Sequence, residues 1–146
     1  MGIKLQAATL VEPFEYISLH DSAMDTECEN FADEFTKYRE GAIDAPPLKP
    51  GEKPAVWTLA PIVDAQLKAM LDGVREEHGR AAWAVMTAAS GIKAVSGIEG
   101  ADGKPLRIRH EFQNGFPTVV REQLNLIGAE ILNELGMVIL THAAPS

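Results

Sequence analysis

A proline-rich stretch between residues 41 and 54 limits most strongly how this chain can fold. Four of its fourteen residues are prolines, namely Pro46, Pro47, Pro50 and Pro54. Because proline lacks a backbone N–H and its ring clashes with the preceding helical turn, no regular helix can run through this stretch. An extended and fairly stiff path is favoured instead. The stretch therefore predicts a linker (41–54) between an N-terminal segment (1–40) and a larger C-terminal part (55–146).

The N-terminal segment has the pattern of one or two short strands followed by a helix. Apolar residues alternate loosely through the first twenty positions. From 25 to 40, apolar residues that include Cys28 recur at helical spacing, and acidic residues occupy the opposite face. Either Asp25 or Thr26 could cap this helix, and Gly41 is suited to end it.

The C-terminal part begins with a strand pattern and continues with helices. Residues 55–60 are rich in β-branched and aromatic side chains, which predicts a strand. Apolar residues at helical spacing predict a helix from Pro61, in its first turn, to Val74, and a second helix of small residues is expected over 81–95. Residues 106–112 alternate between apolar and polar side chains, as in a strand. Tight turns are expected at Asp102-Gly103 and Asn114-Gly115.

The last helix has the most regular apolar pattern in the chain. It is expected to begin at Thr118 and to stop or kink at Gly136. One continuous stripe on its buried face contains Val120, Leu124, Ile127, Ile131 and Leu135. The apolar residues 137–140 fit either a continued helix or a short strand.

These patterns predict an α+β fold in which a small, mostly antiparallel β component is packed with about four helices. The C-terminal half is dominated by helices, and residues 55–146 are expected to form the mainly helical core domain. An all-α chain with irregular extended arms is the alternative. With 46% hydrophobic and 23% charged residues, the composition is that of a folded chain and not of a disordered one.

Acidic residues are concentrated in the N-terminal segment of a chain whose net charge is −8. Between Gln6 and Thr36 there are eight acidic residues and no Lys or Arg. Such a run is either a solvated face or a docking face for a basic partner. The residues proposed for docking are Glu27, Glu29, Asp33 and Glu34. An acidic surface repels phosphate backbones, so no nucleic-acid partner is expected.

No set of polar side chains has the spacing of a catalytic, metal-binding or phosphate-binding site. His110-Glu111 begins like a helical zinc motif, but Asn114 stands where the second histidine would be, and the segment has strand periodicity. The glycines between 97 and 103 do not have the dinucleotide-binding spacing. The sequence therefore predicts no catalytic residue, no cofactor and no metal ligand. A converging carboxylate pair stays open, because sequence does not show which acidic residues meet.

The single cysteine and the N-terminal residues indicate a cytoplasmic protein. Cys28 cannot form an internal disulfide, which fits a reducing compartment. The N-terminus has no apolar core of signal-peptide length, and the longest weakly polar stretch, 81–90, is too short to span a bilayer. No membrane partner is expected.

Two further features allow either a structural or a contact role. Pro46 and Pro47 could be presented as a polyproline ligand, or could belong to a stiff connector. Trp57 could lie in the core or at a protein–protein contact.

Three segments resemble small proteins from the morphogenesis cassettes of tailed bacteriophages. They are LKPGEKPAVWTLAP (48–61), GIEGADGKPL (97–106) and ELGMVI (134–139). The resemblance covers residues 48–140, and Trp57 stands where those proteins usually have an aromatic residue. Such proteins act as minor virion components or tail assembly chaperones, and the resemblance carries over no catalytic residue.

The resemblance and the absence of a chemical motif lead to one leading hypothesis. The chain is expected to be a non-enzymatic structural component of a tailed-phage virion, in the tail, the head–tail region or the capsid. Its partners would be other phage structural proteins or copies of itself, and it would be assembled in the host cytoplasm. The alternatives are a transient tail assembly chaperone and a small enzyme with a site of acidic residues.

Overall fold

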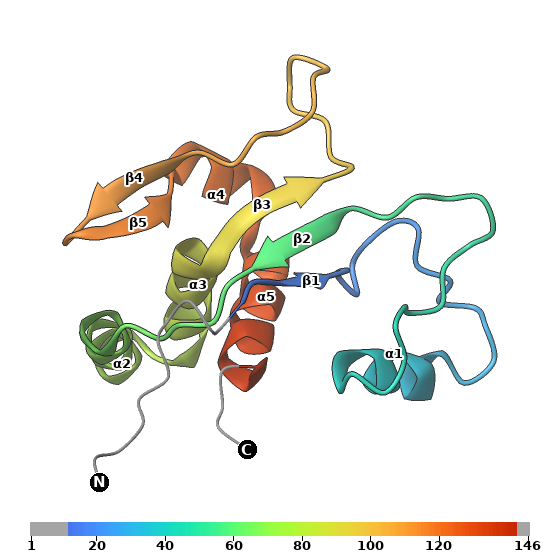
Figure 1. Cartoon of the computed structure of the whole chain (residues 1–146), viewed down its shortest axis with the longest axis horizontal. Coiled ribbons are helices and arrows are strands. Elements are labelled where there is room, and N and C mark those ends of the chain that lie inside the picture. The colour runs from blue at the N-terminus through green and yellow to red at the C-terminus, as the bar shows by residue number, and fades with distance from the viewer. Residues whose placement is uncertain (1–11, 143–146) are drawn as a thin grey trace, which may run out of the picture.

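The computed structural model of the protein describes residues 12–142. Within this range the elements are β1 (Phe14–Tyr16), α1 (Phe31–Arg39), β2 (Val56–Leu59), α2 (Ala65–His78), α3 (Arg80–Gly91), β3 (Ile92–Ser96), β4 (His110–Gln113), β5 (Phe116–Val119), α4 (Arg121–Ile127) and α5 (Ala129–His142). All strand pairs are antiparallel and helices dominate the C-terminal half (Figure 1). The predicted α+β class is confirmed.

In the described part of the chain, two small sheets make up the β component. The first has the strand order β1-β2-β3, and the second is the hairpin β4-β5. In the first sheet Tyr16 pairs with Trp57, and Trp57 pairs with Val95. One sheet therefore contains residues from both sides of the proline-rich stretch.

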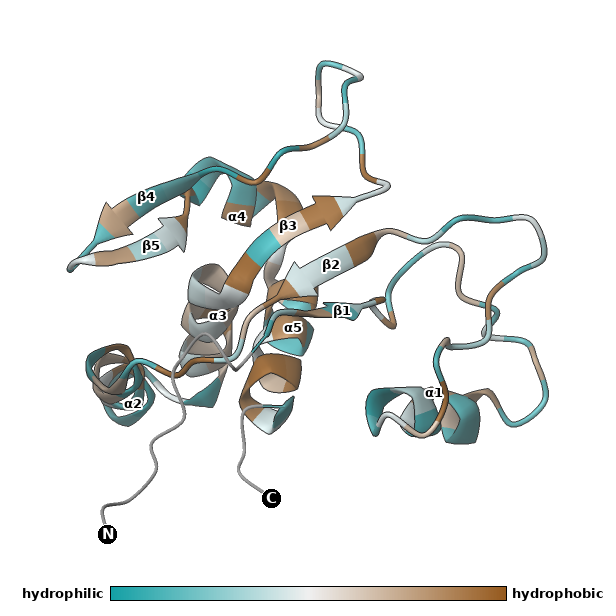
Figure 2. Cartoon of the chain, in the orientation of Figure 1, coloured by the Kyte–Doolittle hydropathy of each residue, from teal (hydrophilic) through white to brown (hydrophobic). Residues whose placement is uncertain are grey.

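The core lies between the first sheet and the helix pair α3 and α5. Trp57, Leu59, Ile92, Leu135 and Ile139 are buried in it. Figure 2 shows hydrophobic residues gathered on β2, β3 and α5, whereas α1 is largely hydrophilic. The first sheet and α5 are therefore held together mainly by removal of apolar surface from water.

Gly136 lies where α5 crosses α3 and does not end a helix. A Cβ atom on Gly136 would lie 1.8 Å from the carbonyl oxygen of Ala84, so the two backbones approach too closely for any side chain. Ala84 and Ala88 are fully buried on the facing helix. The expected stop or kink at Gly136 is wrong, because this glycine serves close packing and α5 continues to His142.

The long helix expected from Thr118 is instead a strand and two helices. Thr118 belongs to β5, and α4 and α5 meet at Gly128 with a bend of 99°. Gly128 has φ +92°, a conformation that favours glycine. Of the predicted stripe, Leu135 is fully buried, whereas Leu124 and the other members are only half-buried.

No single helix within residues 12–142 is long and apolar enough to cross a membrane. The pair α4 and α5 would be long and apolar enough if taken together, but the two helices are bent by 99° at Gly128.

The two preceding helices also differ from their predicted limits: α2 ends at His78, beyond the predicted Val74, and begins later than predicted, whereas α3 ends earlier than predicted. α2 begins at Ala65 and not at Pro61, because the Asp64 side chain accepts hydrogen bonds from the N–H groups of Gln66 and Leu67. α3 ends at Gly91, and residues 92–96 form β3 and not helix. Pairing with β2 supplies the backbone hydrogen bonds that a longer helix would have made.

α1 is shorter than predicted at its start. It begins at Phe31, so neither Asp25 nor Thr26 caps it and Cys28 precedes it. Residues 23–25 instead bond to the proline-rich stretch, with Asp25 N–H donating to Pro47 O at 3.0 Å. Its end is as predicted: Gly41 has φ +82°, and the next N–H donates back to Lys37 O at 2.8 Å.

Both predicted tight turns are present. Gly103 has φ +77°, and Asp102 accepts a hydrogen bond from the N–H of Lys104 at 3.0 Å. Asn114 and Gly115 both have positive φ, 53° and 86°, and connect β4 to β5. The strand expected over 106–112 is confined to β4.

Candidate interaction surfaces

The chain between β1 and β2, residues 17–55, forms a lobe to one side of the main body, with α1 along its lower side in Figure 1. We call it the acidic lobe, because it contains nine acidic residues against four Lys and Arg. Across residues 17–55, α1 is the only helix or strand. The lobe therefore depends on contacts with the body to hold its shape.

An aromatic cluster joins α1 to the body. The rings of Phe35 and Tyr38 lie 6.5 and 5.7 Å from the ring of Tyr16, which belongs to β1. The guanidinium group of Arg39 lies 5.2 Å from the centre of the Phe35 ring. Tyr38 and Arg39 lie on the same side of α1 as Phe35 because they follow it by three and four positions. The Tyr38 hydroxyl also accepts a hydrogen bond from the N–H of Ile17 at 2.8 Å.

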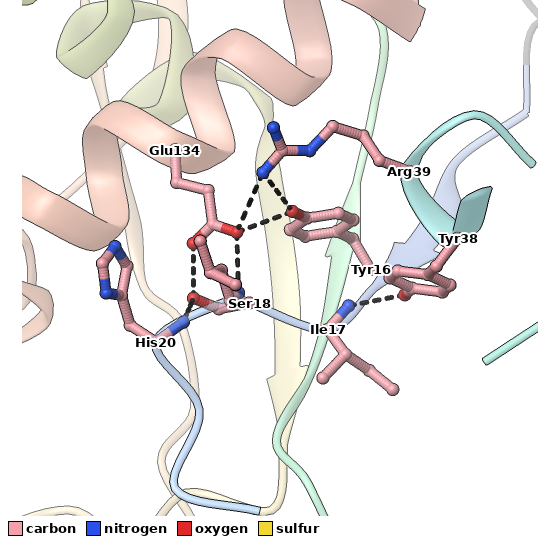
Figure 3. A network of polar contacts seen from close by, with 8 residues as sticks. Tyr16, Ile17, Ser18, His20, Tyr38, Arg39 and Glu134 are labelled. Carbon is pink, nitrogen blue, oxygen red and sulfur yellow. Dashed lines mark hydrogen bonds and ion pairs between the residues drawn. The ribbon is translucent and has the colours of Figure 1, made fainter. Parts of the chain in front are cut away.

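The carboxylate of Glu134, on α5, fixes the start of the lobe to the body (Figure 3). Its Oε2 accepts hydrogen bonds from the Tyr16 hydroxyl at 2.6 Å and from the N–H of Leu19 at 2.7 Å. Its Oε1 accepts one from the Ser18 hydroxyl at 2.5 Å. Arg39 approaches from α1, with Nη2 3.8 Å from Oε2. One carboxylate thus joins three segments that are far apart in the sequence.

The environment of Glu134 allows a charged group to lie nearly buried. Its side chain is only 8% exposed. Burial of a carboxylate is costly unless hydrogen bonds and an opposite charge compensate it, and here both are present. Burial, and then the Glu134 carboxylate, raise the pKa of Tyr16 well above its usual range, so the phenol keeps its proton and acts as a donor. We call this arrangement the Glu134 anchor, because both carboxylate oxygens accept hydrogen bonds from residues at the start of the lobe.

Open depressions flank this anchor. One, of about 560 Å³, is lined by His20, Asn133 and Met137 among other residues. Another, of about 410 Å³, lies on the far side of Arg39, where Phe14 and His142 stack at 3.7 Å between ring centres. Glu130 and Glu134 both line the first depression, and the hydroxyl that contacts Glu134 there is that of Ser18, already part of the network described above. No hydrogen bond of residues 12–142 joins two carboxylates in either depression.

The acidic residues proposed for docking are at the surface of the acidic lobe. Glu27, Glu29 and Asp33 are exposed and form no ion pair with any residue of 12–142. Glu34 is half-exposed and lies 3.5 Å from the Nζ of Lys37. The lobe therefore presents carboxylates whose charge is not neutralised by described neighbours.

The other three proposed contact residues need correction. Pro46 is buried, and the carbonyl of Pro47 accepts a hydrogen bond from Asp25, so this pair is packed into the lobe and is not a free polyproline ligand. Trp57 is 2% exposed and lies in the core between β1 and β3. Its aromatic ring is part of the fold and cannot reach a partner.

No group of three or more His, Cys, Asp or Glu side chains in the described range could hold a metal ion. The Cys28 thiol is also a poor nucleophile, since desolvation and the carboxylates of Asp25 and Glu34 raise its pKa.

The sequence analysis did not identify two residues that matter for these surfaces, Glu134 and Phe112. Glu134 stands out in the sequence only as part of a short motif, although a lone acidic residue within an apolar helix face is a signal for a buried polar contact. Phe112 has the alternation of a half-buried strand, yet it is 77% exposed. Its exposure depends on how far the hairpin extends from the body, which local sequence does not encode.

Comparison of the chain with protein-family models, with curated proteins and with solved structures finds no significant match. The resemblance to phage morphogenesis proteins therefore stays a hypothesis from sequence.

Proposed function

We propose that the protein is a non-enzymatic structural component that works by binding other proteins, with the acidic lobe as its docking surface. The observation that carries this proposal is the exposed, unneutralised set Glu27, Glu29 and Asp33 on a lobe anchored through Glu134. A partner with a basic surface would be attracted to these carboxylates, mainly through a faster encounter.

Preorganisation supports a docking role for the lobe. A segment that must become ordered on binding loses conformational entropy at that moment, which weakens the complex. The aromatic cluster and the Glu134 anchor hold α1, which contains Asp33 and Glu34, against the body before any partner arrives. The hydrogen bond from the Asp25 N–H to Pro47 O holds the segment that leads to Glu27 and Glu29. The lobe can therefore bind as a formed surface.

The assembly we propose is a tailed-phage virion, formed in the host cytoplasm, and this part rests on the resemblance over residues 48–140. The protein would contact other virion proteins or further copies of itself. A transient tail assembly chaperone would use the same surface, but it would leave before the particle is complete.

Mass spectrometry of purified virions tests this assignment. We expect the chain in mature particles at a fixed copy number relative to the major tail protein. Its presence in assembly intermediates only would favour the chaperone. Its absence from both would contradict the phage assignment, while leaving the acidic surface to be tested by itself.

A further inference from the structure

The hairpin β4-β5 has an unpaired edge on β4. The β4 residues are all exposed, and among the large apolar side chains of residues 12–142 Phe112 is the most exposed, at 77%. The hairpin is fixed to the body at both ends: His110 Nε2 lies 2.8 Å from Ile92 O, and the side chain of Asn114 lies 3.6 Å from Met70 Sδ. The edge is therefore a firm surface and not a loose tip.

The register shows which backbone groups point outward. The Val120 N–H donates to Arg109 O just before the strand, so the alternate residues 111 and 113 of β4 are the ones whose backbone groups face β5 in hydrogen-bonded pairs. Phe112 pairs with Pro117 at a position between these, and its N–H and C=O therefore point away from β5. Within residues 12–142 no strand lies on that side of β4.

The two edges of the hairpin are not equivalent. On β5, the outward position opposite Phe112 is Pro117, which has no N–H to offer. Proline is a common way to prevent pairing at a sheet edge, and β4 has no such protection. An exposed edge with an exposed aromatic side chain is suited to accept another strand.

We propose that β4 pairs antiparallel with β4 of a second copy of this chain, with Phe112 opposite Phe112 across a two-fold axis. The two hairpins would then form one four-stranded sheet, in which the Phe112 and Pro117 side chains of both copies gather on one face. This inference rests on the proposed function in one respect: both have the protein act through contacts with other protein chains.

Charge selects this register. β4 has one charged side chain, Glu111, and pairing centred on Glu111 would place two carboxylates directly opposite each other, which is unfavourable. Pairing centred on Phe112 places Glu111 opposite Gln113 of the other copy. The amide of Gln113 already donates to Glu111 in the same strand at 3.1 Å, so the same donor and acceptor can meet across the interface.

The contact is short, so the dimer is expected to be weak. Four residues of each strand bury far less than the roughly 1,000 Å² expected of a stable interface. Within a multi-subunit assembly such a contact gains strength from the other contacts of each copy.

Sedimentation of the purified protein over a concentration series tests this pairing. We expect a reversible dimer at concentrations up to about 1 mM, the weak end of specific association. Phe112→Pro removes the outward N–H without disturbing the hydrogen bonds to β5, and should abolish the dimer. Leu126→Ala removes another exposed apolar side chain and should leave it unchanged. A monomer at all concentrations, or a dimer that persists in Phe112→Pro, would overturn the proposal.

Cross-linking tests the register without depending on that proline variant. Directly opposed residues in a hydrogen-bonded pair have Cα atoms about 5.5 Å apart, within disulfide range. In a Cys28→Ser background, mild oxidation should link Phe112→Cys into dimers, whereas Glu111→Cys should remain largely monomeric. Equal linking of both variants would overturn the register. Because neither experiment involves a particle or the acidic lobe, their failure would not bear on the proposed function.

Discussion

At the scale of single residues, Glu134 joins the N-terminal segments to α5. It is a charged group within an apolar helix, and every partner of its carboxylate among residues 12–142 belongs to the N-terminal third of the chain. We expect this charged group to favour one arrangement of the segments, because another arrangement would leave the charge without partners. The position of the acidic lobe thus depends on one side chain far away in the sequence.

Glu134→Ala should lower the free energy of unfolding by about 3 kcal/mol, since it leaves the Tyr16 and Ser18 hydroxyls and the Leu19 N–H without their acceptor. Urea denaturation measures this loss. Glu130→Ala, one turn earlier and exposed, should change stability little. Equal effects of the two substitutions would remove Glu134 from its anchoring role.

The raised pKa of Tyr16 makes the same anchor sensitive to alkali. Burial and Glu134 raise the pKa in the folded protein, whereas an unfolded tyrosine titrates near 10. The contribution of Tyr16 is therefore fully present below about pH 10 and is lost as pH rises further through the folded pKa. Tyr16→Phe should lower the urea midpoint at neutral pH, and the difference from wild type should shrink above about pH 10.

Comparison of Tyr16→Phe with wild type cancels the effect of other groups that titrate at alkaline pH. Tyr38, whose pKa burial raises, and Lys93, whose pKa burial lowers, are present in both. A difference in urea midpoint that stays constant from neutral to alkaline pH would contradict the assignment of Tyr16 as the titrating donor.

Among the elements, the crossing of α3 and α5 is the most demanding contact. The backbone of α5 lies against the Ala84 carbonyl at Gly136, where a Cβ would need to be 1.8 Å from the oxygen. Both helices must move apart to admit any side chain. The crossing therefore depends on glycine at one position, inside a helix where glycine is otherwise unfavourable.

Gly136→Ala should destabilise the protein by about 1–3 kcal/mol or more, because the core is overpacked. Gly73→Ala is the matched control: Gly73 lies inside α2, and a Cβ added to it would meet no atom within 4 Å, so alanine should stabilise the helix by about 0.5–1 kcal/mol. Thermal unfolding measures both. Stabilisation by both substitutions would contradict the close approach at Gly136.

Helices, strands and turns could be predicted where neighbouring residues in the sequence determine them. They could not be predicted where contacts with distant segments determine them. The strand at 55–60, the turns at Gly103 and Asn114-Gly115, and the end of α1 at Gly41 all follow from residue chemistry. The change from α3 to β3 after Gly91 depends on pairing with β2, and the change from one long helix to α4 and α5 depends on packing around Gly128. Both lie within apolar runs that fit a helix equally well.

At the scale of the whole molecule, the run of acidic residues could be predicted from the sequence, but the way in which the surrounding segments fold together could not. The sequence indicates the carboxylates of Glu27, Glu29 and Asp33 and their lack of basic neighbours. It does not indicate that the proline-rich stretch folds back onto residues 23–25, or that Trp57 is enclosed by strands on both sides. These facts depend on contacts between segments far apart in the chain.

The central claim is that the acidic lobe is a docking surface and not only a solvated face. Its test is the Glu27→Gln, Glu29→Gln, Asp33→Asn, Glu34→Gln variant. The control variant neutralises four exposed acidic residues elsewhere, Asp72, Glu76, Glu77 and Glu130, and so has the same net charge. Both should fold, since exposed charges contribute little to stability.

The measurement is incorporation of each variant into particles, or partner binding, at low and at moderate salt. We predict that the lobe variant associates more slowly than wild type and with a weaker dependence on salt, because exposed charges act mainly on encounter rate and are screened by ions. The control variant should behave like wild type. Incorporation of the lobe variant equal to that of wild type at both salt concentrations would contradict the account.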